Sequence, residues 1–343
     1  MLLLLGLVSV VVGPVVGRTV LFREFPFYHS TNDIHARVAR LKSNCGAPIS
    51  VTSQACGENC QIDVVDIGNP SNSRKVFLLF GEHARELISP ETALAVMEDL
   101  CARNPSRLTA TALSHSQFRI IPNGNPAARR LVEGGEYCMR SNVNGVDLNR
   151  NWDANWSSFS ADDQLNPGQF PFSEKETQIF KSAVADFQPN VFAAIHSGTL
   201  GMYMPWAYSE ASTKAVRNGK KMTEVLSELD TKFCRCPAGG AAREVGYNSP
   251  GTCLDWVHSH TKAEYSYAFE IFTGLGIDDL RKRYREQQSS FRTQPQSLLQ
   301  LDSDYAKDNC FLQFNPETED AFKRTVSNWS HALIELAIIT AAK

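Results

Sequence analysis

Short apolar runs alternate with helical stretches along much of the chain, a pattern typical of α/β proteins. Strands are predicted at residues 61–67, 75–80, 117–121, 191–195 and 265–272. The second of these (KVFLLF) is a continuous apolar run, as expected of a strand buried on both faces of a sheet. Helical patterns cover residues 89–101, 174–186, 212–230 and 317–342. We therefore predict a single α/β domain with a mixed, mostly parallel central sheet flanked by helices.

One predicted helix begins with a capping pattern. Ser89 is expected as the N-cap, Pro90 at the first helical position and Glu91 in the first turn. Much later in the chain, residues 277–309 are rich in Gln, Ser, Asp and Arg, which predicts a surface insertion.

Both ends of the chain are apolar. Residues 1–17 carry no charged side chain and end in small residues before Arg18, which favours a secretory signal peptide. They are short for a membrane span, which needs about 20 residues, although a membrane anchor and a buried element remain alternatives. Residues 317–342 are interrupted by Glu335, which favours a terminal core helix over a lipid-anchor signal. We expect a secreted protein, or one in the lumen of the secretory pathway, without membrane contact once the signal is removed.

The nine cysteines fit an oxidising compartment. Cys56 and Cys60, and likewise Cys234 and Cys236, could be read as metal-binding pairs, but in a secreted chain disulfides are favoured over structural zinc. Because nine is odd, at least one thiol stays unpaired or pairs between chains, and the sequence does not give the connectivity.

Composition excludes several classes of protein. Hydrophobic residues make up 43% of the chain, which is ample for a core and excludes a disordered chain. The 34 Lys and Arg residues against 37 Asp and Glu residues give a formal net charge of −3. A nucleic-acid-binding protein needs a basic surplus to meet phosphates, so we expect no nucleic-acid partner.

Three candidate metal ligands follow two of the predicted buried strands. His83 and Glu86 come just after residues 75–80, and His196 comes directly after residues 191–195. Open α/β sheets place their sites at the carboxyl ends of the strands. Two histidines and one carboxylate around an open fourth position are the ligand set of a hydrolytic zinc site. His-x-x-Glu alone is a common chance match, so the third ligand is what favours one Zn²⁺ per chain over an ordinary loop pair.

Five sequence blocks then follow the order of a known family. They are GEHARE at 81–86, CMRSN and GVDLNRNW within 138–152, IHS at 195–197, GY and LDW within 246–256, and FE at 269–270. Together they resemble the secreted zinc carboxypeptidases of the carboxypeptidase A/B superfamily, from about residue 61 to residue 274. The resemblance implies a zinc carboxypeptidase catalytic domain over residues 18–343, with the C-termini of peptides or proteins as substrates.

The resemblance also implies the residues that do the chemistry. Glu270 corresponds to the general base that takes a proton from water and delivers it to the leaving amine. A glutamate within the apolar run YAFEIF is also costly to bury without a task. Arg140 corresponds to the arginine that stabilises the developing oxyanion. Asp147 corresponds to the carboxylate that holds a ligand histidine, His83, in one tautomer.

Substrate binding is implied in the same way. Asn149 and Arg150 correspond to the pair that grips the terminal carboxylate, which an arginine recognises far better than an internal amide. Tyr247 corresponds to the mobile tyrosine that covers the bound terminal residue, and Arg85 to part of the substrate-binding wall. Leu254 corresponds to the residue that lines the specificity pocket, where an aliphatic side chain implies apolar or aromatic terminal residues.

Some positions depart from the family pattern or adjoin the pocket. Met139 stands where many relatives have Trp, and Gly198 where the pancreatic-type enzymes have an aromatic residue, which leaves the preferred peptide length open. Asp255 is a framework residue on the family pattern, and Cys253 is expected at the pocket wall as a small hydrophobe. Only 65 residues separate a cleavage after Gly17 from the first ligand. We therefore expect no activation domain, and a protein inhibitor is a candidate partner.

Two other functions remain open at this point. A zinc amide hydrolase of the same fold, acting on a non-peptide or cell-wall amide, would use the same metal site but would lack the full Asn149–Arg150 pair. A catalytically silent binding protein would typically have lost a ligand or Glu270, and this chain keeps all of them.

Overall fold

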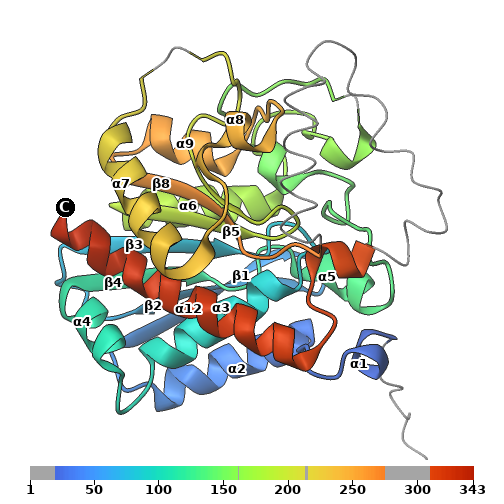
Figure 1. Ribbon diagram of the computed structural model, residues 1–343. Coiled ribbons are helices and arrows are strands. Elements are labelled where there is room, and N and C mark those ends of the chain that lie inside the picture. Colours follow the sequence, from blue (N-terminus) through green and yellow to red (C-terminus); the bar gives the residue numbers. More distant parts are fainter. Residues whose placement is uncertain (1–19, 161, 213–214, 275–309) are drawn as a thin grey trace, which may run out of the picture.

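The computed structural model describes residues 20–160, 162–212, 215–274 and 310–343, and the predicted signal peptide and surface insertion lie outside these residues. An eight-stranded sheet crosses the molecule in the order β1-β2-β4-β3-β5-β8-β6-β7 (Figure 1). Its strands are β1 (Ile49–Gly57), β2 (Cys60–Ile67), β3 (Arg74–Phe80), β4 (Ser116–Ile121), β5 (Val191–His196), β6 (Gly201–Met204), β7 (Ala238–Gly240) and β8 (Tyr265–Glu270).

The centre of the sheet is parallel and its flanks are mixed. Strands β4, β3, β5 and β8 are mutually parallel, whereas β1 and β2 run antiparallel on one side and β6 is antiparallel to β8 on the other. The apolar run of β3 serves both faces, because Val76 and Leu78 join one apolar cluster and Phe77 and Leu79 join the other. The prediction of a mixed, mostly parallel α/β sheet is confirmed.

Helices cover both faces of the sheet (Figure 1). One face carries α2 (Thr31–Asn44), α3 (Ile88–Leu100), α4 (Arg107–His115), α7 (Gly219–Leu229) and α12 (Glu319–Ala342). The other carries α6 (Lys175–Phe187) and α9 (Cys253–His260). Shorter helices are α1 (Val20–Glu24), α5 (Pro126–Glu133) and α8 (Ala241–Val245), with single turns at Leu148–Arg150, Asp163–Leu165 and Asp230–Cys234. None of the helices in the described ranges is long and apolar enough to cross a membrane.

Two predicted helix starts are wrong. Ser89 does not cap α3, because its hydroxyl accepts from the Gly81 N–H (3.1 Å) and donates to the Ile195 carbonyl (2.6 Å), while Leu87 takes the N-cap position. Helix α7 begins at residue 219 rather than 212. The preceding Arg217 donates to the carbonyls of His258 and Ala263, which ties that segment to the end of α9 and the loop after it.

Four disulfides stabilise the described part of the chain. They are Cys45–Cys101, Cys56–Cys60, Cys138–Cys310 and Cys234–Cys236. The closely spaced pairs are therefore disulfides and not metal ligands, as predicted. The ninth cysteine, Cys253, is a buried free thiol.

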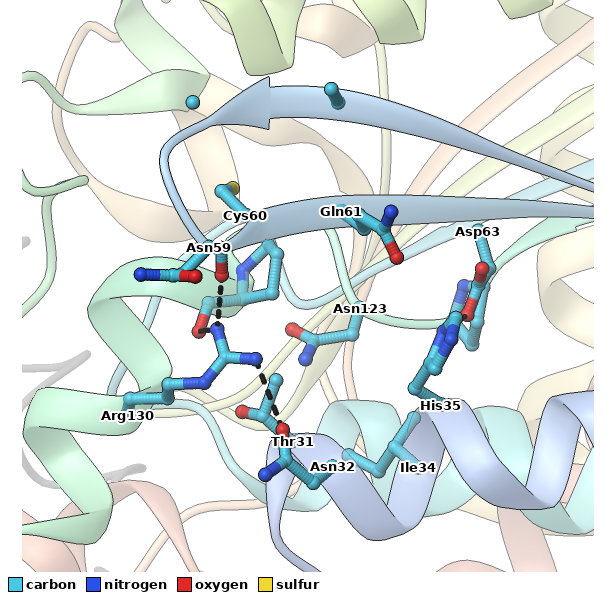
Figure 2. Close-up of a pocket in the computed structure, with 14 residues that line it drawn as sticks. Thr31, Asn32, Ile34, His35, Asn59, Cys60, Gln61, Asp63, Asn123 and Arg130 are labelled. Atoms are coloured by element: carbon cyan, nitrogen blue, oxygen red, sulfur yellow. Dashed lines mark hydrogen bonds and ion pairs between the residues drawn. The ribbon is translucent and has the colours of Figure 1, made fainter.

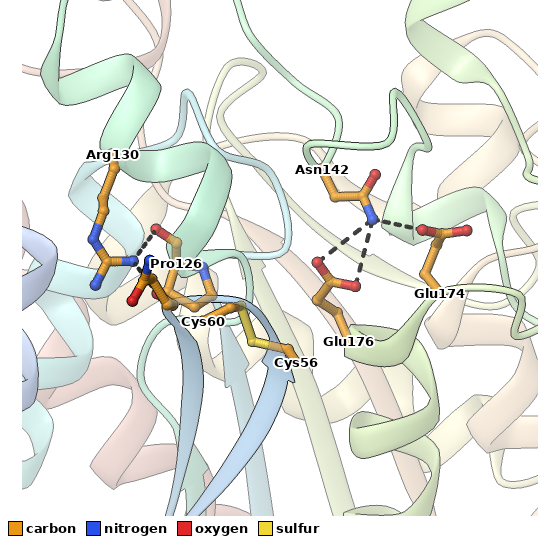
Figure 3. The surroundings of a disulfide bond; sticks show 8 residues. Cys56, Cys60, Pro126, Arg130, Asn142, Glu174 and Glu176 are labelled. Carbon is orange, nitrogen blue, oxygen red and sulfur yellow. Dashed lines mark hydrogen bonds between the residues drawn. A yellow bond between two sulfur atoms is a disulfide. The ribbon is translucent and has the colours of Figure 1, made fainter.

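A polar cavity of about 440 Å³ lies between the β1–β2 hairpin, α2 and α5 (Figure 2). Arg130 of α5 reaches the Asn59 carbonyl at 3.1 Å and the side chain of Asn32 at 3.1 Å. The Cys56–Cys60 disulfide closes the tip of the hairpin beside Arg130 (Figure 3). None of the predicted site residues lines this cavity, so the candidate site lies elsewhere.

Candidate functional site

The central parallel strands bring the predicted metal ligands and the predicted base to one edge of the sheet. Phe80 at the end of β3 pairs with Ile195 of β5, and the next residue of β5, His196, pairs with Glu270 at the end of β8. Parallel strands end at the same edge, so the residues that follow them converge although they are far apart in sequence.

A glycine turn directs the chain from β3 into the site. Gly81 has φ +69°, and a Cβ at this position would lie 2.9 Å from Cγ of Pro90. Only glycine fits both requirements. The Ser89 hydroxyl holds this turn against β5 through its bonds to Gly81 and Ile195. Residues 82–86 are therefore fixed at the end of the strand.

Three donor side chains converge beyond this turn. Nδ1 of His83 lies 2.6 Å from Oε1 of Glu86, and Nδ1 of His196 lies 3.1 Å from Oε2 of the same carboxylate. The two Nδ1 atoms are 3.2 Å apart. All three side chains are buried. Two histidine nitrogens and a carboxylate oxygen can therefore reach one ion.

The electrostatics of this triad suit a cation. Burial by itself would raise the pKa of Glu86, but the charges of His83 and His196 hold it below its ordinary value. Burial opposes protonation of His196, yet Glu86 raises the pKa of this histidine well above its ordinary value. The triad thus favours positive charge at its centre, and a set of two imidazoles and one carboxylate is a zinc ligand set. The residues present therefore fit Zn²⁺.

Asp147 connects the triad to Arg140. Its Oδ1 lies 3.2 Å from Nε2 of His83, and its Oδ2 accepts from Nε of Arg140 at 2.8 Å. Asp147 is fully buried. Burial would raise its pKa, but Arg140 and Arg150 hold the pKa well below its usual range, so it is a carboxylate. A carboxylate on Nε2 leaves the Nδ1 lone pair of His83 free for a metal.

A buried hydrogen-bond network positions the loop that carries Arg140, Asn149 and Arg150. Nδ2 of Asn142 donates to Glu174 at the start of α6 (2.8 Å) and contacts Glu176 (Figure 3). Burial raises the pKa of Glu176. Beyond this anchor, Nδ2 of Asn149 lies 3.4 Å from Nε2 of His196.

Arg150 follows Asn149 in the same short 3₁₀ turn. Its Nη1 donates to the Asn149 carbonyl (2.8 Å) and its Nη2 to the Ser249 hydroxyl (3.2 Å), so the guanidinium is held in one orientation. The Asn149–Arg150 pair therefore lies directly beside the candidate metal site.

Glu270 ends β8 beside the metal triad and is only partly buried. The backbone N–H of Thr199 donates to its Oε2 at 3.4 Å. Burial and the nearby Glu86 raise the pKa of Glu270 to about 7. A carboxylate with a pKa near neutrality can both accept and return a proton, which is what a general base and acid requires.

The sequence model of the zinc carboxypeptidase family (peptidase M14) matches residues 49–285, more than half of the chain. The chain belongs to the zinc carboxypeptidase family. This confirms the resemblance and supports the enzyme class of metallocarboxypeptidases.

Curated relatives include both carboxypeptidase types by name. Zinc carboxypeptidase A 1 of Anopheles gambiae is 23% identical over 71% of this chain and 60% of that protein. Carboxypeptidase A2 of Mus musculus is 23% identical over 72% of this chain and 63% of that protein. Carboxypeptidase B of Astacus astacus is 23% identical over 72% and 87% respectively. The chain thus spans about 60% of the length of the first two.

Solved structures share the fold at low identity. Thrombin activatable fibrinolysis inhibitor (TAFI) superposes with a TM-score of 0.69 and 21% identity, over 91% of this chain and 74% of that one. Carboxypeptidase A of Helicoverpa armigera has a TM-score of 0.63 and 18% identity, over 76% and 72%. These likenesses confirm the predicted fold class.

In this zinc carboxypeptidase-family chain, Leu254 lies in a small apolar cluster. It is buried with Tyr203, Ala207 and Ala241. Asp255 accepts from the backbone N–H groups of Ala207 and Tyr208 (3.0 and 2.9 Å), in keeping with a framework role. Tyr247, which follows α8, is 53% exposed.

Arg85 and Gly198 share an aromatic neighbour, Phe314. The Arg85 guanidinium lies 4.1 Å from the centre of the Phe314 ring. Burial and the neighbouring Arg140 lower the pKa of Arg85 to about 10. Gly198 has φ +132°, and a Cβ there would overlap the same ring. An aromatic side chain from the C-terminal part of the chain therefore stands beside Gly198.

Two buried residues beside the candidate metal site, Glu82 and Cys253, were not among the predicted site residues. Glu82 was only part of a motif, but its buried side chain faces His196. Cys253 is fully buried beside Glu82, with its Sγ 3.5 Å from Oε2. Burial raises the pKa of this thiol, which therefore remains a hydrogen-bond donor. The sequence did offer one indication that Glu82 belongs to the site, because it is a charged residue just after the buried strand β3.

Proposed function

We propose that this protein is a zinc-dependent exopeptidase that hydrolyses the C-terminal peptide bond of peptides and proteins. The observation that carries this proposal is the convergence of the triad His83, Glu86 and His196 with Glu270 at one sheet edge. The Asn149–Arg150 pair beside the triad supports a terminal carboxylate as the recognised group.

Each group has a chemical task in this proposal. His83, Glu86 and His196 would hold Zn²⁺, which would supply Lewis acidity and make a water at the site easier to deprotonate. Glu270 accepts a proton from the attacking water and later donates it to the leaving amine. Arg140, oriented by Asp147 through its Nε, stabilises negative charge that develops on the scissile carbonyl oxygen.

The remaining candidate residues bind the substrate. Asn149 and Arg150 grip the terminal carboxylate, and a fixed guanidinium favours two parallel hydrogen bonds to it. Tyr247 is exposed on its loop and can cover the bound residue. Arg85 contributes to the wall of the site. A C-terminal amide lacks the charge that this arrangement recognises, so it should be a poor substrate.

The protein is proposed to act outside the cytosol. Four disulfides suit an oxidising compartment. In this proposal residues 1–17 are a signal peptide and residues 18–343 the catalytic domain. A protein inhibitor is a candidate partner, since bovine TAFI, which shares the fold (TM-score 0.65), was solved in complex with tick carboxypeptidase inhibitor.

Release of the last residue from N-terminally blocked peptides tests the function. The peptides differ only at their C-terminus, which is Phe, Leu, Arg, Glu or an amidated Phe, and each is tried with and without a zinc chelator. We expect release of Phe or Leu that the chelator abolishes and added zinc restores. If the folded, zinc-loaded protein releases nothing, or cleaves the amidated peptide equally well, the exopeptidase proposal is wrong.

An apolar preference at the terminal residue is proposed from Leu254, which packs with Tyr203, Ala207 and Ala241 in a small apolar cluster. Leu254→Asp should lower kcat/KM for C-terminal Phe by about 10- to 100-fold, because a buried carboxylate repels an apolar ring. It should also raise release of C-terminal Arg, since an acid pairs with the guanidinium. Kinetics on the Phe and Arg peptides measure both changes.

Leu254→Ile is the matched control for that variant. It keeps an aliphatic side chain and should leave the ratio of kcat/KM for Phe and Arg nearly unchanged. If wild-type protein releases Arg in preference to Phe, the pocket assignment is wrong while the zinc chemistry stands. An unchanged ratio in Leu254→Asp would place the specificity pocket elsewhere.

A further inference from the structure

The buried carboxylate of Glu82 contacts His196 of the metal triad on the side of the ring away from Glu86. Glu82 lies between Gly81 and His83 and is 2% exposed. Its Oε2 is 3.4 Å from Nε2 of His196. Its Oε1 accepts the indole N–H of the fully buried Trp152 at 3.1 Å, and the thiol of Cys253 lies 3.5 Å from Oε2. The carboxylate is therefore held by donors from two other segments of the chain.

The two ligand histidines have matching surroundings. Each turns its Nδ1 toward Glu86 and its Nε2 toward a different buried carboxylate, Asp147 for His83 and Glu82 for His196. A neutral imidazole carries its single proton on one of the two nitrogens. An acceptor at Nε2 keeps the proton there and leaves the Nδ1 lone pair for the metal.

Another neighbour of His196 favours the opposite tautomer. Nδ2 of Asn149 lies 3.4 Å from Nε2 of His196. The oxygen of this amide already accepts the backbone N–H of Cys253 (3.0 Å), so the nitrogen faces the ring. An amide nitrogen can only donate, and donation to Nε2 would leave the proton on Nδ1, where it blocks metal binding. The choice of tautomer therefore depends on Glu82.

We propose that Glu82 is a positioning residue for the metal site, which keeps the proton of His196 on Nε2 and so prepares Nδ1 to bind zinc. This inference rests on the proposed zinc site and extends it. Trp152 and Cys253 contribute indirectly, because their N–H and S–H groups donate to the Glu82 carboxylate and orient it. Glu82 therefore precedes one candidate ligand, His83, in the sequence but orients the other, His196 of β5.

Zinc affinity of Glu82→Gln tests the inference. The dissociation constant is measured by competition with a chromophoric chelator, and we expect zinc to bind about 10- to 100-fold more weakly than to wild type. The rise in melting temperature on adding zinc should shrink accordingly. With cobalt in place of zinc, the visible absorption bands should shift, because the His196 ligand loses its fixed orientation.

Glu133→Gln is the matched control. Glu133 is also a buried glutamate, but it accepts from the backbone N–H and hydroxyl of Thr31 and contacts no metal ligand. This variant should show wild-type zinc affinity even if its apo form melts earlier. A purely structural role of Glu82 would lower the melting temperature of both forms equally and leave the zinc affinity unchanged.

The outcomes separate this inference from the proposed function. If wild type binds zinc and releases C-terminal residues while Glu82→Gln binds zinc equally tightly, the inference alone is overturned. If wild type binds no zinc, both are overturned. Should Glu82→Gln fail to fold, Glu82→Leu replaces it, and unchanged zinc affinity in that variant overturns the inference as well.

Discussion

Replacement of Glu270 by glutamine is expected to lower kcat/KM for peptide hydrolysis by about 10³-fold, because an amide cannot accept the proton of the attacking water. Glutamine keeps the size of the side chain and an oxygen for the Thr199 N–H. Glu270 is not among the three convergent donors, so bound zinc should remain stoichiometric. Steady-state kinetics on a C-terminal Phe peptide and metal analysis of the same sample measure the two effects.

Glu264→Gln is the control for that variant. Glu264 directly precedes β8 and pairs with Arg74 at 3.4 Å, away from the metal triad. Its replacement should leave kcat/KM unchanged. Full activity of Glu270→Gln, or an equal loss in Glu264→Gln, would contradict the assignment of Glu270 as the base.

The fall of kcat/KM at acidic pH should reflect protonation of Glu270. Burial and Glu86 raise the pKa of Glu270 to about 7, and the base form is the deprotonated one. kcat/KM should therefore fall as the pH drops through this pKa. The charge of bound zinc favours the carboxylate, which places the midpoint at or below about 7. A profile of kcat/KM against pH should lose this fall in Glu270→Gln, and a wild-type profile that rises toward acidic pH would contradict the role.

Replacement of Glu86 by alanine is expected to release the metal and to lower activity by at least about 10³-fold at stoichiometric zinc. Its two oxygens lie 2.6 and 3.1 Å from the Nδ1 atoms of His83 and His196. Without this carboxylate, the two imidazoles are the remaining ligands of the triad, and neither carries a negative charge to balance the ion. Zinc content after desalting, and hydrolysis rates before and after adding zinc, measure the loss.

Glu91→Ala is the control for the Glu86 variant. Glu91 is also buried against a histidine, with its Oε2 2.6 Å from Nδ1 of His29, but it lies outside the triad. This variant should lose stability and keep its zinc. A Glu86→Ala protein that retains one zinc ion and normal activity would show that another residue completes the ligand set.

Strands with strong apolar runs were predictable, and elements with weak patterns were not. The buried run of β3 fixes that strand locally, whereas β1 is a largely exposed edge strand that forms because β2 pairs with it. Helix α2 buries few residues, so its apolar pattern is weak, although Ser30 and Asp33 form a capping box at its start. Long-range bonds overrode the local pattern at Ser89, whose hydroxyl bridges two strands instead of capping α3.

The convergence of the three candidate metal ligands was predictable because each lies at or after the end of a buried strand, and parallel strands end at one edge. The aromatic neighbour of Gly198 was not, since Phe314 comes from a segment more than a hundred residues later in the chain. The free cysteine also required the structure, because only the four observed disulfides show that Cys253 is left over.

The sequence by itself determined the α/β class, the family and the candidate metal ligands at the ends of the central strands. Apolar runs and motif spacing are local properties of the chain, so they can be recognised without the fold. The tertiary structure alone decided which side chains oppose one another across the site. Glu82 is adjacent to His83 in sequence, yet its carboxylate faces His196. Such a pairing depends on the distance and direction between strand ends, which are set by sheet packing and not by the residues next to Glu82.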